Sequence, residues 1–245
     1  MKVLTTRPED SQEQTIKAFE EAGFEVHNLP MVQTLKTHQL ASLKRPERLI
    51  EDIDCVILSS PRGARFFVEL YKRDDFVGRT VAAVGPSTAK VLKEAGFEPI
   101  VPHRYDQEGL IDLLVHRPAL IRVLYFGALE KRRDLIEELE TLGRKVIDFP
   151  AYRTVCTRLK EEDVLHWVVW SEVMVFFSPS AVRCLTKALG GSRNLLKLVD
   201  GRRIVAIGHV TAKALKKQGV MKVVYPARHD LTGVVELLKE LANGA

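Results

Sequence analysis

VAAVGPSTAKVLKEAGF at residues 81 to 97 recurs at residues 204 to 220 as IVAIGHVTAKALKKQGV. The two stretches align without a gap and share eight identical residues in seventeen positions. Each contains a short apolar strand, a turn with glycine, and a helix that closes at a second glycine, Gly96 or Gly219. Strands that alternate with helices in this way indicate an α/β fold with parallel sheets.

Two more pairs of segments repeat in the same order. VLTTRP (3 to 8) matches VLYFGA (123 to 128), and VILSSPRGARFF (56 to 67) matches VFFSPSAVRCL (175 to 185). An internal repeat in a chain of 245 residues favours two related lobes, each of ordinary domain size. The predicted fold class is therefore α/β, with two similar lobes that are each a parallel sheet flanked by helices. A site between the lobes is the first place to expect function.

Two extended segments stand at equivalent places in the repeats. PMVQTLKT covers residues 30 to 37 and PAYRTVCT covers residues 150 to 157. Either segment can be an edge strand or a connection between lobes. If both connect lobes, one lobe is built from both ends of the chain.

Composition limits the class of protein. The chain is 46% hydrophobic and 28% charged, which suits a globular protein, and it has no apolar run near the ~20 residues that span a bilayer. We expect a cytoplasmic protein without a membrane partner. The net charge of +5 favours a small polyanion over nucleic acid, because the basic residues form no long run. Cys55, Cys156 and Cys184 are widely spaced among apolar residues, so we predict buried thiols and neither a disulfide framework nor a zinc site.

Several candidate ligand-binding residues follow predicted strands. Ser60 and Ser178 each precede a proline at a helix start, and Thr88 and Thr211 lie just after the repeated glycines. These residues suit helix capping alone. Four similar helix starts can also bind the carboxylates of one polyanionic ligand. A dinucleotide fingerprint and a phosphate loop are both missing from the sequence, which gives nucleotide binding little support.

Arginines and one tyrosine complete the candidate site. Arg7, Arg62, Arg132 and Arg133 follow predicted strands and can grip carboxylates. Tyr152 aligns with a valine, Val32, in the other repeat, so the two copies differ there. A phenol can donate a proton to a departing oxygen, or can simply pack at a hinge. The histidines have no metal-site spacing, and no nucleophile has an evident partner base.

The ordered set of motifs resembles the uroporphyrinogen-III synthase family along nearly the whole chain. The motifs are TRP near the N-terminus, SSPRGARFF, AAVGPSTAKVLKEAGF, EGLIDLL, RRDLIEEL, PAYRTV, FFSPSAVRCL, AIGHVTAKALKKQG and LTGVVELL. The resemblance implies a discontinuous lobe of residues 1–35 plus 156–245 and a second lobe of residues 39–151. It also implies a two-stranded linker of residues 34–38 and 152–156.

The same resemblance implies a cyclising carbon-oxygen lyase of tetrapyrrole and heme biosynthesis. Its substrate is hydroxymethylbilane, a linear tetrapyrrole octacarboxylate, which closes to uroporphyrinogen III with loss of water and inversion of the last pyrrole ring. The family implies no cofactor and no metal. Tyr152 matches the tyrosine that assists hydroxide departure. The matching substrate-binding positions are Ser60, Arg62, Thr88, Arg132, Ser178 and Thr211.

Other functions remain open from the residues themselves. A bilobed protein that binds an acidic metabolite without chemistry fits the same candidate residues. A nucleotide-dependent enzyme is disfavoured because the phosphate loop is missing. A monomer is the expected oligomeric state, since one chain already supplies two lobes.

Overall fold

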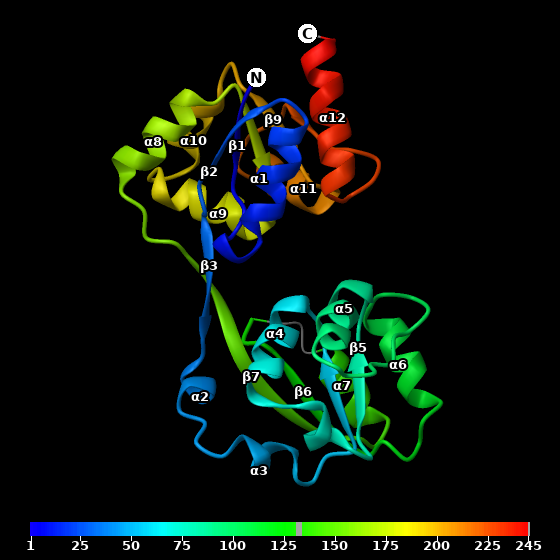
Figure 1. Cartoon of the computed structure of the whole chain (residues 1–245). Helices are drawn as coiled ribbons and strands as arrows, with labels where there is room; N and C mark the ends of the chain where they lie inside the picture. Colours follow the sequence, from blue (N-terminus) through cyan, green and yellow to red (C-terminus); the bar gives the residue numbers. More distant parts are fainter. Residues whose placement is uncertain (131–133, 245) are drawn as a thin grey trace. The chain divides into compact units, whose positions relative to one another are not determined.

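The computed structural model describes residues 1–130 and 134–244 and divides into two compact units (Figure 1). Unit 1 combines Met1–Thr34 with Val155–Ala245, and unit 2 is Leu35–Thr154. Both ends of the chain therefore contribute to unit 1, and the middle of the chain forms unit 2.

The sheet of unit 1 has the strand order β10-β9-β8-β1-β2, and each neighbouring pair is parallel. Its strands are β1 (Lys2–Thr5), β2 (Glu25–Asn28), β8 (Val173–Phe176), β9 (Arg203–Ala206) and β10 (Val223–Val224). Its helices are η1 (Glu9–Ser11), α1 (Gln12–Glu21), α8 (Glu161–Trp170), α9 (Pro179–Ala188), α10 (Ser192–Val199), α11 (His209–Lys217) and α12 (Leu231–Asn243). Helices between parallel strands are what the repeated strand-helix pattern predicts.

The second sheet has the order β3-β7-β6-β4-β5, in which β7, β6, β4 and β5 are parallel. Its strands are β3 (Val32–Lys36), β4 (Cys55–Leu58), β5 (Thr80–Ala83), β6 (Arg122–Ala128) and β7 (Lys145–Cys156). The helices of unit 2 are α2 (His38–Ala41), α3 (Pro46–Ile50), α4 (Pro61–Leu70), η2 (Arg73–Phe76), α5 (Pro86–Glu94), α6 (Gln107–Val115) and α7 (Asp134–Thr141).

The repeated segments form equivalent strands in the two units. In unit 1 the order is β9-β8-β1-β2, and the matching segments of unit 2 stand in the order β5-β4-β6-β7. The fifth strand of unit 1, β10, has its counterpart in a single parallel bridge between Ala82 and Ile100. The predicted fold class, two α/β lobes with parallel sheets, is confirmed.

Apolar side chains cover both faces of each sheet, which explains why the strands are continuous apolar runs. In β8, Val175 faces the core beneath α1 and α12, which lie side by side in Figure 1. Its neighbours Met174 and Phe176 face the opposite core, beneath α8 to α11. This alternation leaves the strand ends and the helix starts as the places where polar groups are available to a ligand.

Strands β3 and β7 contain the boundaries between the units. The two strands run antiparallel, because Thr37 N–H donates to Ala151 O at 3.0 Å while Thr157 N–H donates to Met31 O at 3.1 Å. The boundaries fall after Thr34 and after Thr154, inside these strands. The extended segments at residues 30–37 and 150–157 are therefore paired strands through which the chain passes from one unit to the other.

Cysteine pairing differs from the sequence-based prediction. Cys156 at the end of β7 and Cys184 in α9 form a disulfide, with Cα atoms 5.3 Å apart and a sequence separation of 28. The prediction of three buried thiols was therefore wrong for this pair, because sequence spacing does not reveal that a strand end lies beside a distant helix. Cys55 is a buried free thiol, and burial raises its pKa to about 12.

Helices in the described parts of the chain are short, and α12 has 13 residues. None of these helices combines the length and apolar character needed to cross a membrane. Nor do His, Cys, Asp and Glu side chains within residues 1–130 and 134–244 gather in groups of three that could hold a metal ion.

Candidate active site

Ser60 and Tyr152 meet at the carboxyl-terminal edge of the sheet in unit 2. Ser60 comes two residues after β4 and is the N-cap of α4, where its Oγ accepts the N–H of Gly63 at 3.0 Å. The Oη of Tyr152 lies 2.7 Å from the same Oγ. The pair joins residues 92 positions apart in sequence. Because parallel strands end at one edge of a sheet, β4 and the later part of β7 bring the two hydroxyls together.

A β-bulge turns Tyr152 toward α4. Gly127 of β6 pairs with Pro150, but the next residue, Ala128, pairs with Tyr152, so Ala151 is an extra residue on β7. Successive strand residues ordinarily face opposite sides of a sheet. Here Ala151 and Tyr152 both belong to the buried cluster beneath α4, as expected where a bulge redirects a side chain.

The ring of Tyr152 is packed, with only 6% of the residue exposed. Its centroid lies 5.8 Å from that of Phe66. A Cβ at Gly63 would stand 3.6 Å from Tyr152 Cε1, so α4 and the ring are in close contact. The phenol is therefore fixed in place before any ligand binds.

The Ser60–Tyr152 hydrogen bond can run in either direction. Ser60 Oγ accepts the N–H of Gly63 with one lone pair and still has its own proton, so it can donate to Tyr152 Oη. When Ser60 donates to Tyr152 Oη, the phenolic proton of Tyr152 can be donated to a ligand instead. This arrangement provides a positioned proton donor at the strand edge.

A second hydroxyl pair lies beside the first and was missed by sequence reasoning. Tyr125 Oη on β6 donates to Ser59 Oγ at 2.9 Å. Burial, more than any other effect, raises the pKa of Tyr125. The sequence signal for this pair was the two consecutive serines after a buried strand. Neighbouring residues there point in different directions, so Ser59 contacts Tyr125 while Ser60 contacts Tyr152.

The other predicted site residues of unit 2 lie on helix starts or outside the described residues. Thr88 is buried in the first turn of α5, where its N–H donates to Gly85 O at 3.1 Å. Arg62 is the second residue of α4 and is half-buried. Arg132 and Arg133 lie outside the described residues.

Unit 1 repeats the helix caps without the tyrosine. Ser178 Oγ accepts the N–H of Ala181 at 3.1 Å, as Ser60 does for α4, and Thr211 is buried in the first turn of α11. The position that matches Tyr152 is Val32, which is buried in the apolar core of unit 1. The proton-donating arrangement of unit 2 is thus replaced by an apolar side chain.

Arg7 is engaged within its own unit. Its Nε donates to Thr15 Oγ1 at 3.0 Å, and its guanidinium lies 4.1 Å from the ring centroid of Phe177. Its backbone N–H donates to Asn28 Oδ1 at 3.0 Å. These contacts give Arg7 a structural role at the end of β1.

Comparison with known proteins identifies the family. A family model described as uroporphyrinogen-III synthase HemD matches residues 13–236. The chain belongs to the uroporphyrinogen-III synthase family. The resemblance predicted from the ordered motifs is confirmed by this match, which spans both units.

Relatives within the uroporphyrinogen-III synthase family cover nearly the whole chain. A putative uroporphyrinogen-III synthase of Methanothermobacter thermautotrophicus is 28% identical over 96% of both chains. The chloroplastic uroporphyrinogen-III synthase of Oryza sativa subsp. japonica is 26% identical over 97% of this chain and 80% of the rice protein.

Solved structures of the family share the fold. A mutant uroporphyrinogen III synthase from the extremely thermophilic bacterium Thermus thermophilus superimposes with a TM-score of 0.64 at 19% identity, covering 100% of both chains. The uroporphyrinogen-III synthetase of Helicobacter pylori 26695 gives a TM-score of 0.67 at 16% identity, covering 98% of this chain and 99% of that one.

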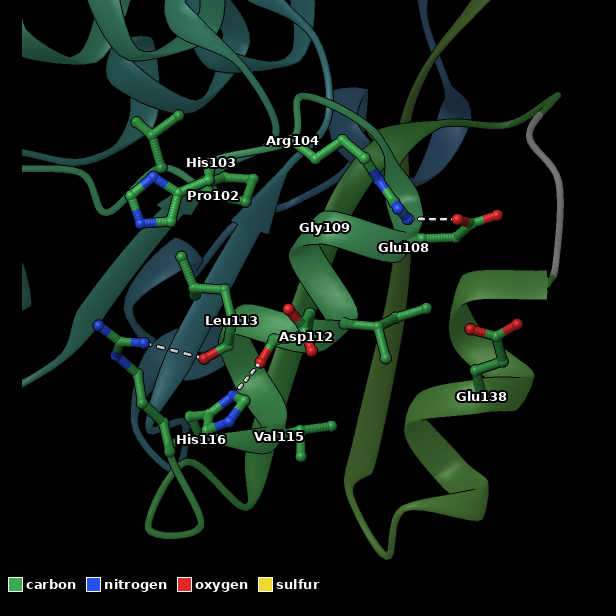
Figure 2. A pocket seen from close by; sticks show the side chains of 13 residues that line it. Pro102, His103, Arg104, Glu108, Gly109, Asp112, Leu113, Val115, His116 and Glu138 are labelled. Atoms are coloured by element: carbon green, nitrogen blue, oxygen red, sulfur yellow. Dashed lines mark hydrogen bonds and ion pairs between the residues drawn. The ribbon is translucent and has the colours of Figure 1, made fainter.

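A surface hollow of about 860 Å³ lies elsewhere in unit 2, along α6 (Figure 2). Arg104 and Glu108 form an ion pair at one end of it, and Glu138 of α7 lies across from α6. Neither Ser60 nor Tyr152 lines this hollow. The hydroxyl pair at the strand edge, which the family motifs select, is the better candidate for the active site of this synthase-family chain.

Proposed function

We propose that the protein is a uroporphyrinogen-III synthase, a cyclising lyase of heme biosynthesis. It converts hydroxymethylbilane to uroporphyrinogen III, with loss of water and inversion of the last pyrrole ring. The family match over residues 13–236 carries the proposal. The fold supports it too, because solved synthases share it.

The chemistry begins at the hydroxymethyl carbon of the substrate. Electrons from the pyrrole nitrogen expel the hydroxyl group, and Tyr152 donates its phenolic proton so that the oxygen leaves as water. The substituted α-carbon of the last pyrrole attacks the resulting azafulvene cation and gives a spiro intermediate. The bond from that carbon to its original methylene bridge then breaks and re-forms at the other α-carbon of the same ring, which inverts the ring. Tyr152 recovers a proton when the rearranged pyrrole loses one, so the net loss is one water molecule.

Orientation contributes more than acid catalysis in this scheme. The open-chain substrate closes without enzyme to the unrearranged type I ring, so the protein must hold the chain ends for the rearranging attack. Orientation of this kind can contribute several kcal/mol, on the order of 7 or more in favourable cases. The hydrogen bond to Ser60 and the packing against α4 hold the Tyr152 proton donor in one orientation.

Both units supply substrate-binding residues in this proposal. They are Ser60, Arg62, Thr88, Arg132, Ser178 and Thr211, with the helix starts beside them attracting carboxylates. The proposal treats residues 1–35 plus 156–245 and residues 39–151 as the two lobes, and residues 34–38 and 152–156 as their linker. The paired strands β3 and β7 support that division.

Further parts of the proposal concern the setting of the enzyme. We infer a cytoplasmic monomer that acts without a cofactor or metal. The Cys156–Cys184 disulfide bears on the location. Structural disulfides are uncommon in a reducing cytoplasm, and the known exception is the intracellular proteins of hyperthermophiles. Gel filtration with light scattering tests the monomer, and fractionation of native cells tests the location.

The deciding experiment is incubation of the purified protein with hydroxymethylbilane, followed by separation of the uroporphyrin isomers after oxidation. The type III isomer should dominate. A reaction that yields only the type I isomer at the uncatalysed rate would overturn the proposal.

A further inference from the structure

A further repeat appears once the structure is known. RYDQEGLIDLL at residues 104 to 114 and RHDLTGVVELL at residues 228 to 238 occupy equivalent places, each leading from a loop into a helix, α6 or α12. Arginine, aspartate, glycine and two leucines recur at matched positions. The residue after the arginine differs, since it is Tyr105 in unit 2 and His229 in unit 1.

The two loops are held by the same contacts. In unit 2, Asp106 Oδ1 accepts the N–H of Gly109 at 2.8 Å and the Nε of Arg104 at 3.0 Å. A Cβ at Gly109 would overlap the carbonyl oxygen of Arg104, so glycine is required for this close approach. The loop conformation is therefore fixed by the capping aspartate, the arginine and the glycine together.

Unit 1 repeats this construction. Asp230 Oδ1 accepts the N–H of Gly233 at 2.8 Å, and Asp230 Oδ2 accepts the Nε of Arg228 at 2.9 Å. A Cβ at Gly233 would overlap the carbonyl oxygen of Arg228. Two units with different surface residues thus preserve one rigid loop.

Each rigid loop displays an exposed ring beside a strand-end turn. Tyr105 is 61% exposed, and its Cβ lies 3.5 Å from where a Cβ of Gly85 would be. His229 is exposed, and its ring would be 2.9 Å from a Cβ at Gly208, so a larger residue there would displace the ring. The ring of His209 lies 5.4 Å from that of His229.

These rings stand at the edge of each sheet where the candidate residues lie. Gly85 follows β5, whose parallel neighbour β4 leads to Ser60, and Gly208 follows β9, whose neighbour β8 leads to Ser178. An aromatic ring that a rigid loop keeps in solvent forgoes the stabilisation that burial would provide. A ligand with flat rings and carboxylates can supply that burial, and it meets an imidazole donor in unit 1.

We propose that Tyr105 and His229 are substrate-binding residues, whose rings pack on pyrrole rings of the tetrapyrrole, with His229 also donating to a substrate carboxylate. This inference rests on the proposed function and extends the site beyond the residues that the motifs select. The role is one of binding, so the two side chains should affect substrate affinity and leave the chemical step nearly unchanged.

The test compares Tyr105→Ala and His229→Ala with two control variants, Val77→Ala and Met221→Ala. The control residues are 72% and 70% exposed. They precede β5 and β10 and so lie at the amino-terminal ends of these strands, away from the candidate residues at the carboxyl-terminal ends. With hydroxymethylbilane, KM should rise about five- to tenfold for the first two variants, while kcat changes less than about twofold. The control variants should keep wild-type constants.

Two further measurements separate binding from folding and from the proposed function. Tyr105→Phe keeps the ring and should restore KM to within about twofold of the wild type, and the melting temperature should stay unchanged in all variants. Fluorescence titration with uroporphyrin III, an octacarboxylate, measures binding without turnover. If the wild type makes no type III isomer, the proposed function fails, yet the titration still decides this inference. Equal affinity of wild type, Tyr105→Ala and His229→Ala would overturn it.

Discussion

Reduction of the Cys156–Cys184 disulfide should destabilise unit 1 selectively. Both cysteines belong to unit 1, and the bond closes a loop with a sequence separation of 28. In the chain-entropy treatment, a loop of that size gives the unfolded chain about 12 cal/mol/K more entropy once the bond is cut, or about 3.5 kcal/mol at 25 °C. With a urea dependence of about 2 kcal/mol/M, the unfolding midpoint should fall by about 1.5 to 2 M.

Tryptophan fluorescence reports on unit 1 alone, which makes the assay selective. The chain has two tryptophans, Trp167 and Trp170, and both lie in α8 of unit 1. Urea unfolding followed by this fluorescence, with and without a phosphine reductant, gives the change in unit 1. Circular dichroism records the unfolding of both units. Because the disulfide lies in unit 1, a transition that belongs to unit 2 should keep its midpoint when the reductant is added.

A thiol count and a matched variant complete the experiment. Unfolded without reductant, the protein should expose one reactive thiol, Cys55, and after reduction it should expose three. The double variant Cys156→Ala/Cys184→Ala should not respond to reductant. Three thiols before reduction would refute the disulfide itself. One thiol before reduction, with a midpoint that reductant leaves unchanged, would refute the chain-entropy argument.

Three other predictions concern the strand edge and one ion pair. Tyr152→Phe should lower kcat at least about tenfold with little change in KM, because it removes the proton donor and keeps the ring. Ser60→Ala and Ser178→Ala each remove a helix cap and should lower unfolding free energy by about 1 kcal/mol; only Ser60→Ala should also lower kcat, since Tyr152 loses its partner. Hydrogen bonds from Arg122, chiefly its backbone N–H, lower the pKa of Asp54 below its ordinary 3.8. Stability from Asp54 is therefore present at neutral pH and lost as the pH falls below 3.8, so Asp54→Asn should destabilise at pH 7 and progressively less in acid.

Each of these predictions has an outcome that contradicts it. Unchanged turnover in Tyr152→Phe would reduce Tyr152 to a packed hinge residue. Equal kcat in Ser60→Ala and Ser178→Ala would mean that the Tyr152 contact has no part in catalysis. Urea unfolding at several pH values measures the Asp54 effect, and a stability gap between wild type and Asp54→Asn that persists undiminished in strong acid would contradict the linkage argument.

Much of the fold could be predicted from the repeat. Strands such as β4 and β8 are continuous apolar runs because helices cover both faces of each sheet, so their type and order were readable from sequence. The Cys156–Cys184 bond could not be predicted, because it depends on where the end of β7 meets α9. Loop support around Tyr105 was also hidden, since only the structure reveals that Arg104, Asp106 and Gly109 act together.

The candidate site depends on a feature of register that composition does not encode. The repeat identified Tyr152 as the place where the two copies differ, but an unbulged β7 would turn consecutive residues to opposite faces. The extra residue at Ala151 brings Tyr152 to the same side as Ala151, within 2.7 Å of Ser60. In unit 1 the matching Val32 is buried in apolar core. Because the helix caps are alike in both units, the tyrosine and its bulge are what distinguish the strand ends of unit 2 from those of unit 1.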